Sequence, residues 1–130
     1  NVPHRNELSE TVGYKIITQK TSTIYLPDID SWEDWDVDIS SLIHDNDLIF
    51  LDGTFYDKAE LKLRDISKVP HPSIVESTRI FDQLDVALRS KIVFTHFNHT
   101  NKILHPMSKE KSELISRGYN IPEEGQEYLI

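Results

Sequence analysis

The segments DLIFL at residues 47–51 and KIVFTHF at residues 91–97 decide the fold of this chain. Both are dense in β-branched and aromatic residues, which is typical of strands buried inside a sheet. Two further strand-like segments, at residues 11–18 and 23–26, flank the sequence QKTS, which predicts a hairpin turn. Because the chain opens with a hairpin, we expect a mixed sheet rather than a fully parallel one.

Helices are predicted between and after these strands by their N-terminal signals. Three sites place a capping residue three positions before a Glu, so that each side chain can accept a hydrogen bond from the other's backbone N–H: Asp30 with Glu33, Asp57 with Glu60, and Ser73 with Glu76. The third site predicts the longest helix, over residues 73–89, and another helix is expected over residues 108–117. A short strand is expected at residues 126–129. Strands that alternate with helices indicate an α/β fold.

Composition narrows the class of protein. The chain has 130 residues, 14 basic and 22 acidic, with a formal net charge of −8. This length suits one domain that buries about two-thirds of its unfolded surface. The acidic balance argues against broad nucleic-acid binding. No apolar run approaches the roughly 20 residues of a membrane span, and the absence of cysteine excludes disulfides, thiolate zinc sites and cysteine nucleophiles. We expect a soluble, cytoplasmic protein without a membrane partner.

Polar residues follow the predicted strands at the points where they end. Asp28 follows TIYLP, Asp52 follows DLIFL, and His96 lies near the end of KIVFTHF, while His4 precedes the hairpin. Open α/β sheets bind ligands beyond the ends of their strands, so these side chains can converge. Imidazole and carboxylate together suit zinc, manganese or iron.

Each of these residues also has a purely structural interpretation. Asp28 could form a turn, and His96 could be a hydrogen-bonded core residue on the strand face of Ile92 and Phe94. His71 directly precedes the capped helix at residue 73, where it could donate a proton to a leaving oxygen or be an exposed residue at a helix entry. Asp30 is interpreted as a helix cap rather than a ligand.

The sequence Asp52-Gly53-Thr54 after a hydrophobic strand is similar to the haloacid-dehalogenase phosphatase motif. That motif needs its nucleophilic Asp two residues earlier, where this chain has Phe50. A phenyl ring cannot replace a carboxylate nucleophile, so this interpretation is rejected. A receiver domain, which also carries an Asp at a strand end, ranks low.

Five segments occur in a fixed order that resembles a known family. They are VPHR at 2–5, TVGY at 11–14, YLPD at 25–28, LDGTF at 51–55 and FTHFNHTN at 94–101. Together they resemble the second half of metallo-β-lactamase-superfamily proteins, above all the branch that contains the coenzyme pyrroloquinoline quinone (PQQ) biosynthesis protein B. The resemblance implies half of an αββα sandwich, a mixed β-sheet with outer helices, over residues 1–130.

The resemblance also implies roles for individual residues. His4 resembles the metal-ligand His of the third motif, Asp28 the Asp that bridges two metals, and His96 the last ligand His, with His99 as the fallback. The metal would be zinc, manganese or iron.

Two residues occupy the places of the catalytic pair in the superfamily's phosphodiesterases. His71 would be the helper that protonates the leaving group, and Asp52 would orient it. No separate organic cofactor site is implied.

One signature of the superfamily, His-x-His-x-Asp-His, is absent from all 130 residues. It belongs to the N-terminal half of the domain. We therefore expect the chain to be the remainder of a longer protein, inactive alone, whose exposed sheet face needs the missing half or a second copy in a homodimer.

The leading hypothesis is a metal-dependent hydrolase that acts on a phosphodiester or related ester through a metal-activated water. The first alternative is a PQQ biosynthesis protein B-like enzyme or carrier, such as an iron-dependent oxygenase. The second alternative is a metal-free binding module on the same fold.

Overall fold

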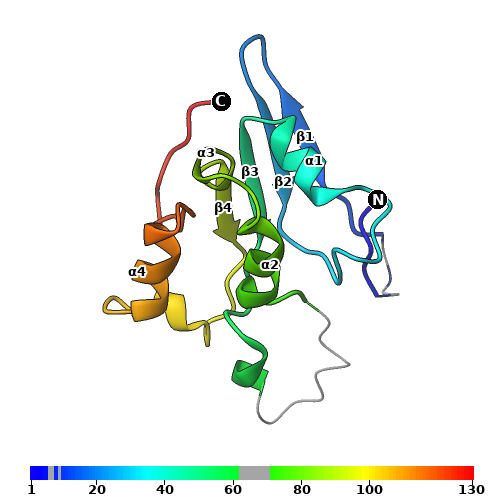
Figure 1. The fold of residues 1–130 in the computed structure, drawn as a ribbon. Helices are drawn as coiled ribbons and strands as arrows, with labels where there is room; N and C mark the ends of the chain where they lie inside the picture. The colour runs from blue at the N-terminus through cyan, green and yellow to red at the C-terminus, as the bar shows by residue number, and fades with distance from the viewer. Residues whose placement is uncertain (6–7, 9, 62–70) are drawn as a thin grey trace.

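The computed structural model of the protein describes residues 1–5, 8, 10–61 and 71–130, and its centre is a four-stranded sheet in the order β1-β2-β3-β4 (Figure 1). The strands are β1 (Tyr14–Ile17), β2 (Ser22–Leu26), β3 (Leu48–Asp52) and β4 (Ile92–Thr95). β1 pairs antiparallel with β2, and β2, β3 and β4 run parallel to one another. The expected mixed sheet is therefore confirmed.

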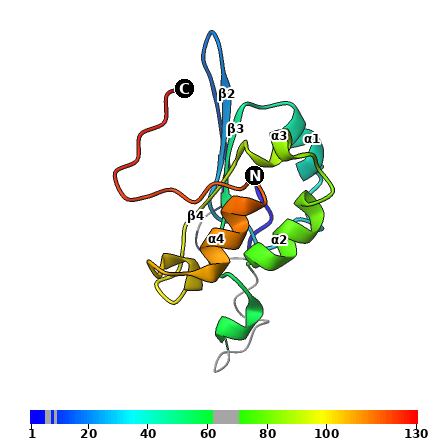
Figure 2. The same ribbon diagram turned by 60° about the vertical axis from the view of Figure 1, so that its left-hand side comes forward.

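Period-two alternation assigns the side chains of the strands to two different faces. On β2, β3 and β4, one face carries the buried apolar residues Ile24, Leu26, Ile49, Leu51, Ile92 and Phe94. The helices α1 (Ile39–His44), α2 (Ile74–Phe81) and α3 (Val86–Arg89) lie along this face (Figures 1 and 2). α4 (Lys109–Ser116) adds Leu114 to the same core. The short 3₁₀ helices η1 (Lys58–Leu61) and η3 (Lys102–Leu104) lie in the connections.

Two of the predicted helix starts are confirmed in detail. The Ser73 side chain accepts from the Glu76 backbone N–H, while the Glu76 carboxylate accepts from the Ser73 N–H. Ser108 caps α4, and Gly118 follows it with a φ of 96°, a left-handed conformation that favours glycine. The signal at Asp57 begins only the short 3₁₀ helix η1, and its expected continuation lies outside the described residues.

The prediction of one helix over residues 73–89 is wrong, because the segment forms two. α2 ends at Asp82, and Asp85 begins α3 by accepting a hydrogen bond from the backbone N–H of Leu88. Asp82 instead binds side chains from elsewhere in the chain, including the hydroxyl of Tyr119 at 2.8 Å. The apolar periodicity runs through the break, so the pattern alone could not reveal it.

The predicted helix at Asp30 and the tail strand at residues 126–129 are also wrong. Asp30 accepts hydrogen bonds from the backbone N–H and the guanidinium of Arg5, and the residues that follow it form a turn. The next helix, α1, is capped by Asp38. The tail has no strand, although Tyr128 packs edge-on against Phe50 with ring centroids 5.0 Å apart.

The second face of the sheet is partly open on its β1–β2 side. Tyr14 pairs with Tyr25 across these strands, and their side chains are 60% and 41% exposed. Ile16 on the same face is 43% exposed. An apolar sheet face left open in this way can pack against a further layer of structure.

Among the described residues, no helix is long and apolar enough to cross a membrane.

Candidate metal centre

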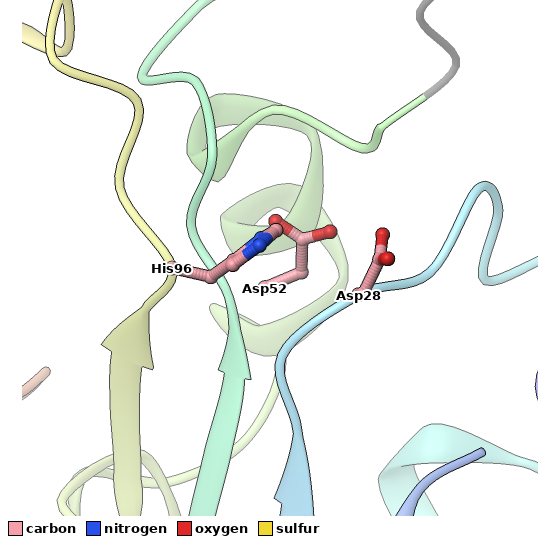
Figure 3. A group of neighbouring side chains, drawn as sticks. All are labelled: Asp28, Asp52 and His96. Atoms are coloured by element: carbon pink, nitrogen blue, oxygen red, sulfur yellow. The ribbon is translucent and has the colours of Figure 1, made fainter. Parts of the chain in front are cut away.

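Three potential metal ligands meet where the parallel strands end (Figure 3). Asp28 follows β2, Asp52 is the last residue of β3, and His96 directly follows β4. One ligand atom from each lies within 4.8 Å of the others, a spacing that could hold a metal ion. The parallel pairing of β2, β3 and β4 produces this convergence, because their carboxyl ends lie at one edge of the sheet.

The backbone at the ends of β3 and β4 is unusually constrained. His96 adopts a left-handed conformation with a φ of 61°, which is uncommon outside glycine and occurs often at functional sites. A Cβ added to Gly53 would lie 2.9 Å from the carbonyl oxygen of Thr95, so only glycine fits. The Gly53 N–H donates to the same oxygen at 2.8 Å. Glycine thus lets the two strand ends approach closely.

The Asp52 side chain has no exposed surface and accepts hydrogen bonds on both oxygens. Oδ1 accepts from the backbone N–H of Thr54 at 2.8 Å and from its hydroxyl at 2.7 Å. Oδ2 accepts from the Ile29 N–H at 3.2 Å and lies 2.7 Å from Nδ1 of His71. A buried carboxylate needs such partners, and here they also define its orientation.

His71 lies in the same buried cluster, next to both acidic residues. Its Nδ1 is 2.7 Å from Oδ2 of Asp52 and 3.6 Å from Oδ1 of Asp28. Burial alone would lower the pKa of His71, but the hydrogen bond and charge of Asp52, together with the charge of Asp28, raise the pKa above its ordinary value. The position before the capped start of α2 holds the ring at the site.

His4 reaches the site from the N-terminal segment. Its Nε2 lies 3.4 Å from Oδ1 of Asp28 and 3.7 Å from Oδ1 of Asp30. Nε2 of His4 and Oδ1 of Asp28 are both buried, and neither has a hydrogen-bond partner in the described part of the chain. Two adjacent buried ligand atoms without such partners fit a cation between them. Imidazole and carboxylate are also among the donor types that bind zinc.

The structure thus brings His4, Asp28, Asp52, His71 and His96 together. The grouping places Asp52 among the potential ligands, whereas the sequence indicated an orienting role for it. The fallback His99 is exposed, outside that group, and lines an open groove with His105 and the start of α4.

Two residues near the site had no role in the sequence interpretation. Thr54 connects Asp52 to the neighbouring imidazoles, since its hydroxyl also lies 3.1 Å from Nδ1 of His96. Asn101 is buried, and its amide donates to the carbonyl oxygen of Gly53 at 2.8 Å and to that of Thr54 at 3.3 Å. For Thr54 the available signal was its position two residues after the strand-end Asp52, a turn-forming arrangement. For Asn101 it was the last position of the HFNHTN run.

Comparison with known proteins identifies the family of the chain. The family described as beta-lactamase superfamily domain matches residues 1–97, which is most of the chain. The chain belongs to this family. Its α/β fold and mixed sheet agree with the fold that the resemblance implied.

Relatives of this superfamily domain include curated proteins named Coenzyme PQQ synthesis protein B. The protein from Methylobacillus flagellatus is 28% identical over 98% of this chain and 44% of its own length. The protein from Cupriavidus necator is 22% identical over 98% of the chain and 43% of its own length. The chain therefore spans less than half the length of these relatives.

A solved structure shares the fold. The crystal structure of zinc-bound PqqB from Methylobacterium extorquens matches with a TM-score of 0.67 and 21% identity, over 88% of this chain and 42% of that chain. The superfamily domain and its similarity to protein B of PQQ synthesis are thus confirmed.

Proposed function

We propose that this chain provides the C-terminal half-site of a metal-dependent hydrolase that cleaves a phosphodiester or related ester. The observation that carries the proposal is the convergence of Asp28, Asp52 and His96, with one ligand atom from each within 4.8 Å of the others. Superfamily membership supports it independently.

The ligands on this chain would be His4, Asp28 and His96. The buried Nε2 of His4 and Oδ1 of Asp28, which lie 3.4 Å apart, support the first two. A bound zinc or similar divalent ion lowers the pKa of a coordinated water toward neutrality and polarises the bond to be cleaved. Manganese and iron suit the same donor types.

The catalytic pair would be His71 and Asp52. With Nδ1 of His71 held 2.7 Å from Oδ2 of Asp52, the ring atom left to carry a proton to the leaving oxygen is Nε2. Asp52 in turn accepts hydrogen bonds from Thr54 and Ile29. The orientation of the His71 ring would therefore be fixed before the substrate binds.

The active site would be complete only with a further part of the domain. Three ligands from this chain leave most of a two-metal site unfilled, and the relatives are more than twice as long as the segment matched here. The open β1–β2 face, with Tyr14, Ile16 and Tyr25, supports a second sheet docking there. That sheet would come from the N-terminal half of the domain or from a second copy.

A second candidate is a role in PQQ synthesis, either as an enzyme or as a carrier. Relatives named Coenzyme PQQ synthesis protein B align over 98% of the chain, which supports this candidate. Redox-active iron would favour an oxygenase. Zinc does not separate the two candidates, because the PqqB structure is itself zinc-bound, so turnover of a phosphodiester must distinguish them.

The first test is metal content by inductively coupled plasma mass spectrometry, on the unchanged protein, Asp28→Ala and the control Asp45→Ala. Asp45 is an exposed carboxylate at the C-terminal end of α1, paired with His44. We expect near-stoichiometric zinc, manganese or iron that falls in Asp28→Ala alone. Turnover of bis(4-nitrophenyl) phosphate by the full-length protein would then support the hydrolase. Protein without metal in all three samples would refute the half-site and favour a metal-free module.

A further inference from the structure

The hydroxyl of Thr54 lies between a carboxylate and two imidazoles at the metal centre. Oγ1 is 2.7 Å from Oδ1 of Asp52, 3.1 Å from Nδ1 of His96 and 3.5 Å from Nδ1 of His71. Thr54 is 92% buried, since only 8% of its surface is exposed. A polar group with three such neighbours, away from solvent, has few ways to arrange its hydrogen bonds.

The chemistry of these groups determines which atom donates. A carboxylate oxygen only accepts, and Thr54 has one hydroxyl hydrogen, which it gives to Oδ1 of Asp52 over 2.7 Å. Toward His96 the hydroxyl can then only accept, so the hydrogen between them belongs to Nδ1 of His96. Neutral His96 therefore carries its proton on Nδ1, which leaves the lone pair of Nε2 available.

The position of this hydroxyl is itself well supported. The Thr54 N–H donates to Oδ1 of Asp52 at 2.8 Å. Its carbonyl oxygen accepts from the Asn98 N–H at 2.9 Å and from the Asn101 amide at 3.3 Å. Both asparagines follow β4, on the loop that carries His96. The loop after β3 and the loop after β4 are thus bound to each other around the Thr54–His96 contact.

We propose that Thr54 is a positioning residue that fixes the tautomer and orientation of His96, so that Nε2 faces the metal. Asp52 then orients both histidines, His71 directly and His96 through the Thr54 hydroxyl. A metal-bound His commonly donates its second N–H to a carboxylate or a similar acceptor, which fixes the ring and strengthens the ligand. The inference rests on the proposed function only in naming His96 as a ligand.

The test measures side-chain ¹⁵N chemical shifts of the metal-free protein, at a pH where its histidines are neutral. His96 is expected to show the Nδ1–H tautomer in the unchanged protein and in Thr54→Ser, which keeps the hydroxyl. In Thr54→Val, which has the same shape without a hydroxyl, the population should shift toward Nε2–H. A His96 that is already Nε2–H in the unchanged protein would overturn the inference, and that measurement needs no variant.

Metal affinity provides the second readout. Thr54→Val should bind zinc about 10–100-fold more weakly, while Thr54→Ser should stay close to the unchanged protein. Zinc binding that is equal in all three proteins, with an unchanged tautomer, would refute the role of Thr54 and leave the proposed function standing. The expected tautomers without zinc binding in any of the proteins would refute the metal site and leave the Thr54–His96 relationship standing.

Discussion

Nδ1 of His71 lies 2.7 Å from Oδ2 of Asp52, a side chain with no exposed surface. The two residues are 19 positions apart, one at the end of β3 and the other before α2. Their contact joins the edge of the sheet to the helical layer at the candidate site. Since the carboxylate also holds Thr54 and Ile29, the site and the fold depend on the same buried group.

Replacing this carboxylate by its amide should therefore destabilise the protein. In Asp52→Asn an amide NH2 group replaces one carboxylate oxygen and faces N–H and O–H donors, whose hydrogen bonds it cannot accept. The negative charge that strengthens this buried hydrogen-bond network is also lost. We expect a loss of about 3 kcal/mol in the free energy of unfolding, measured with urea. The matched control is Asp47→Asn, since Asp47 is exposed and accepts from the N–H and hydroxyl of Ser22. Equal losses in the two variants would contradict the importance of burial at Asp52.

The left-handed backbone of His96 predicts a conflict between stability and metal binding. Its φ of 61° strains any residue with a Cβ, and glycine adopts it freely. His96→Gly should therefore be more stable than His96→Ala by about 1 kcal/mol, measured by urea unfolding. Both variants should lose metal to the same extent. If His96→Ala were as stable as His96→Gly, the backbone strain would not exist in solution.

The strand ends could be predicted from sequence because buried strands have a local signature. Dense β-branched segments located β3 and β4, and the residues directly after them had to lie at one edge of a parallel sheet. Asp52 and His96 were therefore recognisable as neighbours. His4 and His71 come from irregular segments, so the sequence marked them as candidates without showing that they lie at the same site, and the resemblance to known proteins implied their roles.

The hydrogen bonds within the site could not be predicted in this way. Whether Asp52 contacts His71 or Thr54 contacts His96 depends on side-chain packing between segments up to 42 positions apart. The break between α2 and α3 was hidden for the same reason. Asp82 is bound there by Arg117 and Tyr119, which lie at least 35 positions further along the chain.

The open sheet face predicts self-association of this chain. Tyr14, Ile16 and Tyr25 expose apolar surface on neighbouring strands, and burying a tyrosine side chain is strongly favourable. Tyr25→Lys should weaken self-association roughly tenfold, equivalent to about 1.4 kcal/mol, measured by sedimentation equilibrium. Ile115→Lys is the control, because Ile115 is 52% exposed on α4 rather than on the sheet. An equal effect of both substitutions would point to charge rather than to this face.

The surroundings of Asp82 predict how the free energy of unfolding depends on pH in the acid range. Burial alone would raise its pKa, but the hydrogen bonds of Tyr119 and Arg117, the charge of Arg117 and the hydrogen bond of Arg89 hold the pKa below its ordinary value. A carboxyl whose pKa is lower in the folded state stabilises the protein above its unfolded-state pKa, about 4. This stabilisation disappears as the pH falls through the lower, folded-state pKa.

Asp82→Asn should therefore be less stable than the unchanged protein at neutral pH, and the difference should shrink below about pH 4. Urea unfolding between neutral and acid pH measures this difference directly. Asp45→Asn is the control, because its side chain is 72% exposed beside His44 and should change stability little at any pH. A constant difference between Asp82→Asn and the unchanged protein across the acid range would mean that the variant loses packing rather than a charge. Tyr119→Phe distinguishes a loss of packing from a loss of charge stabilisation. It keeps the buried ring but removes the 2.8 Å hydrogen bond to Asp82, so it should reproduce part of the pH dependence.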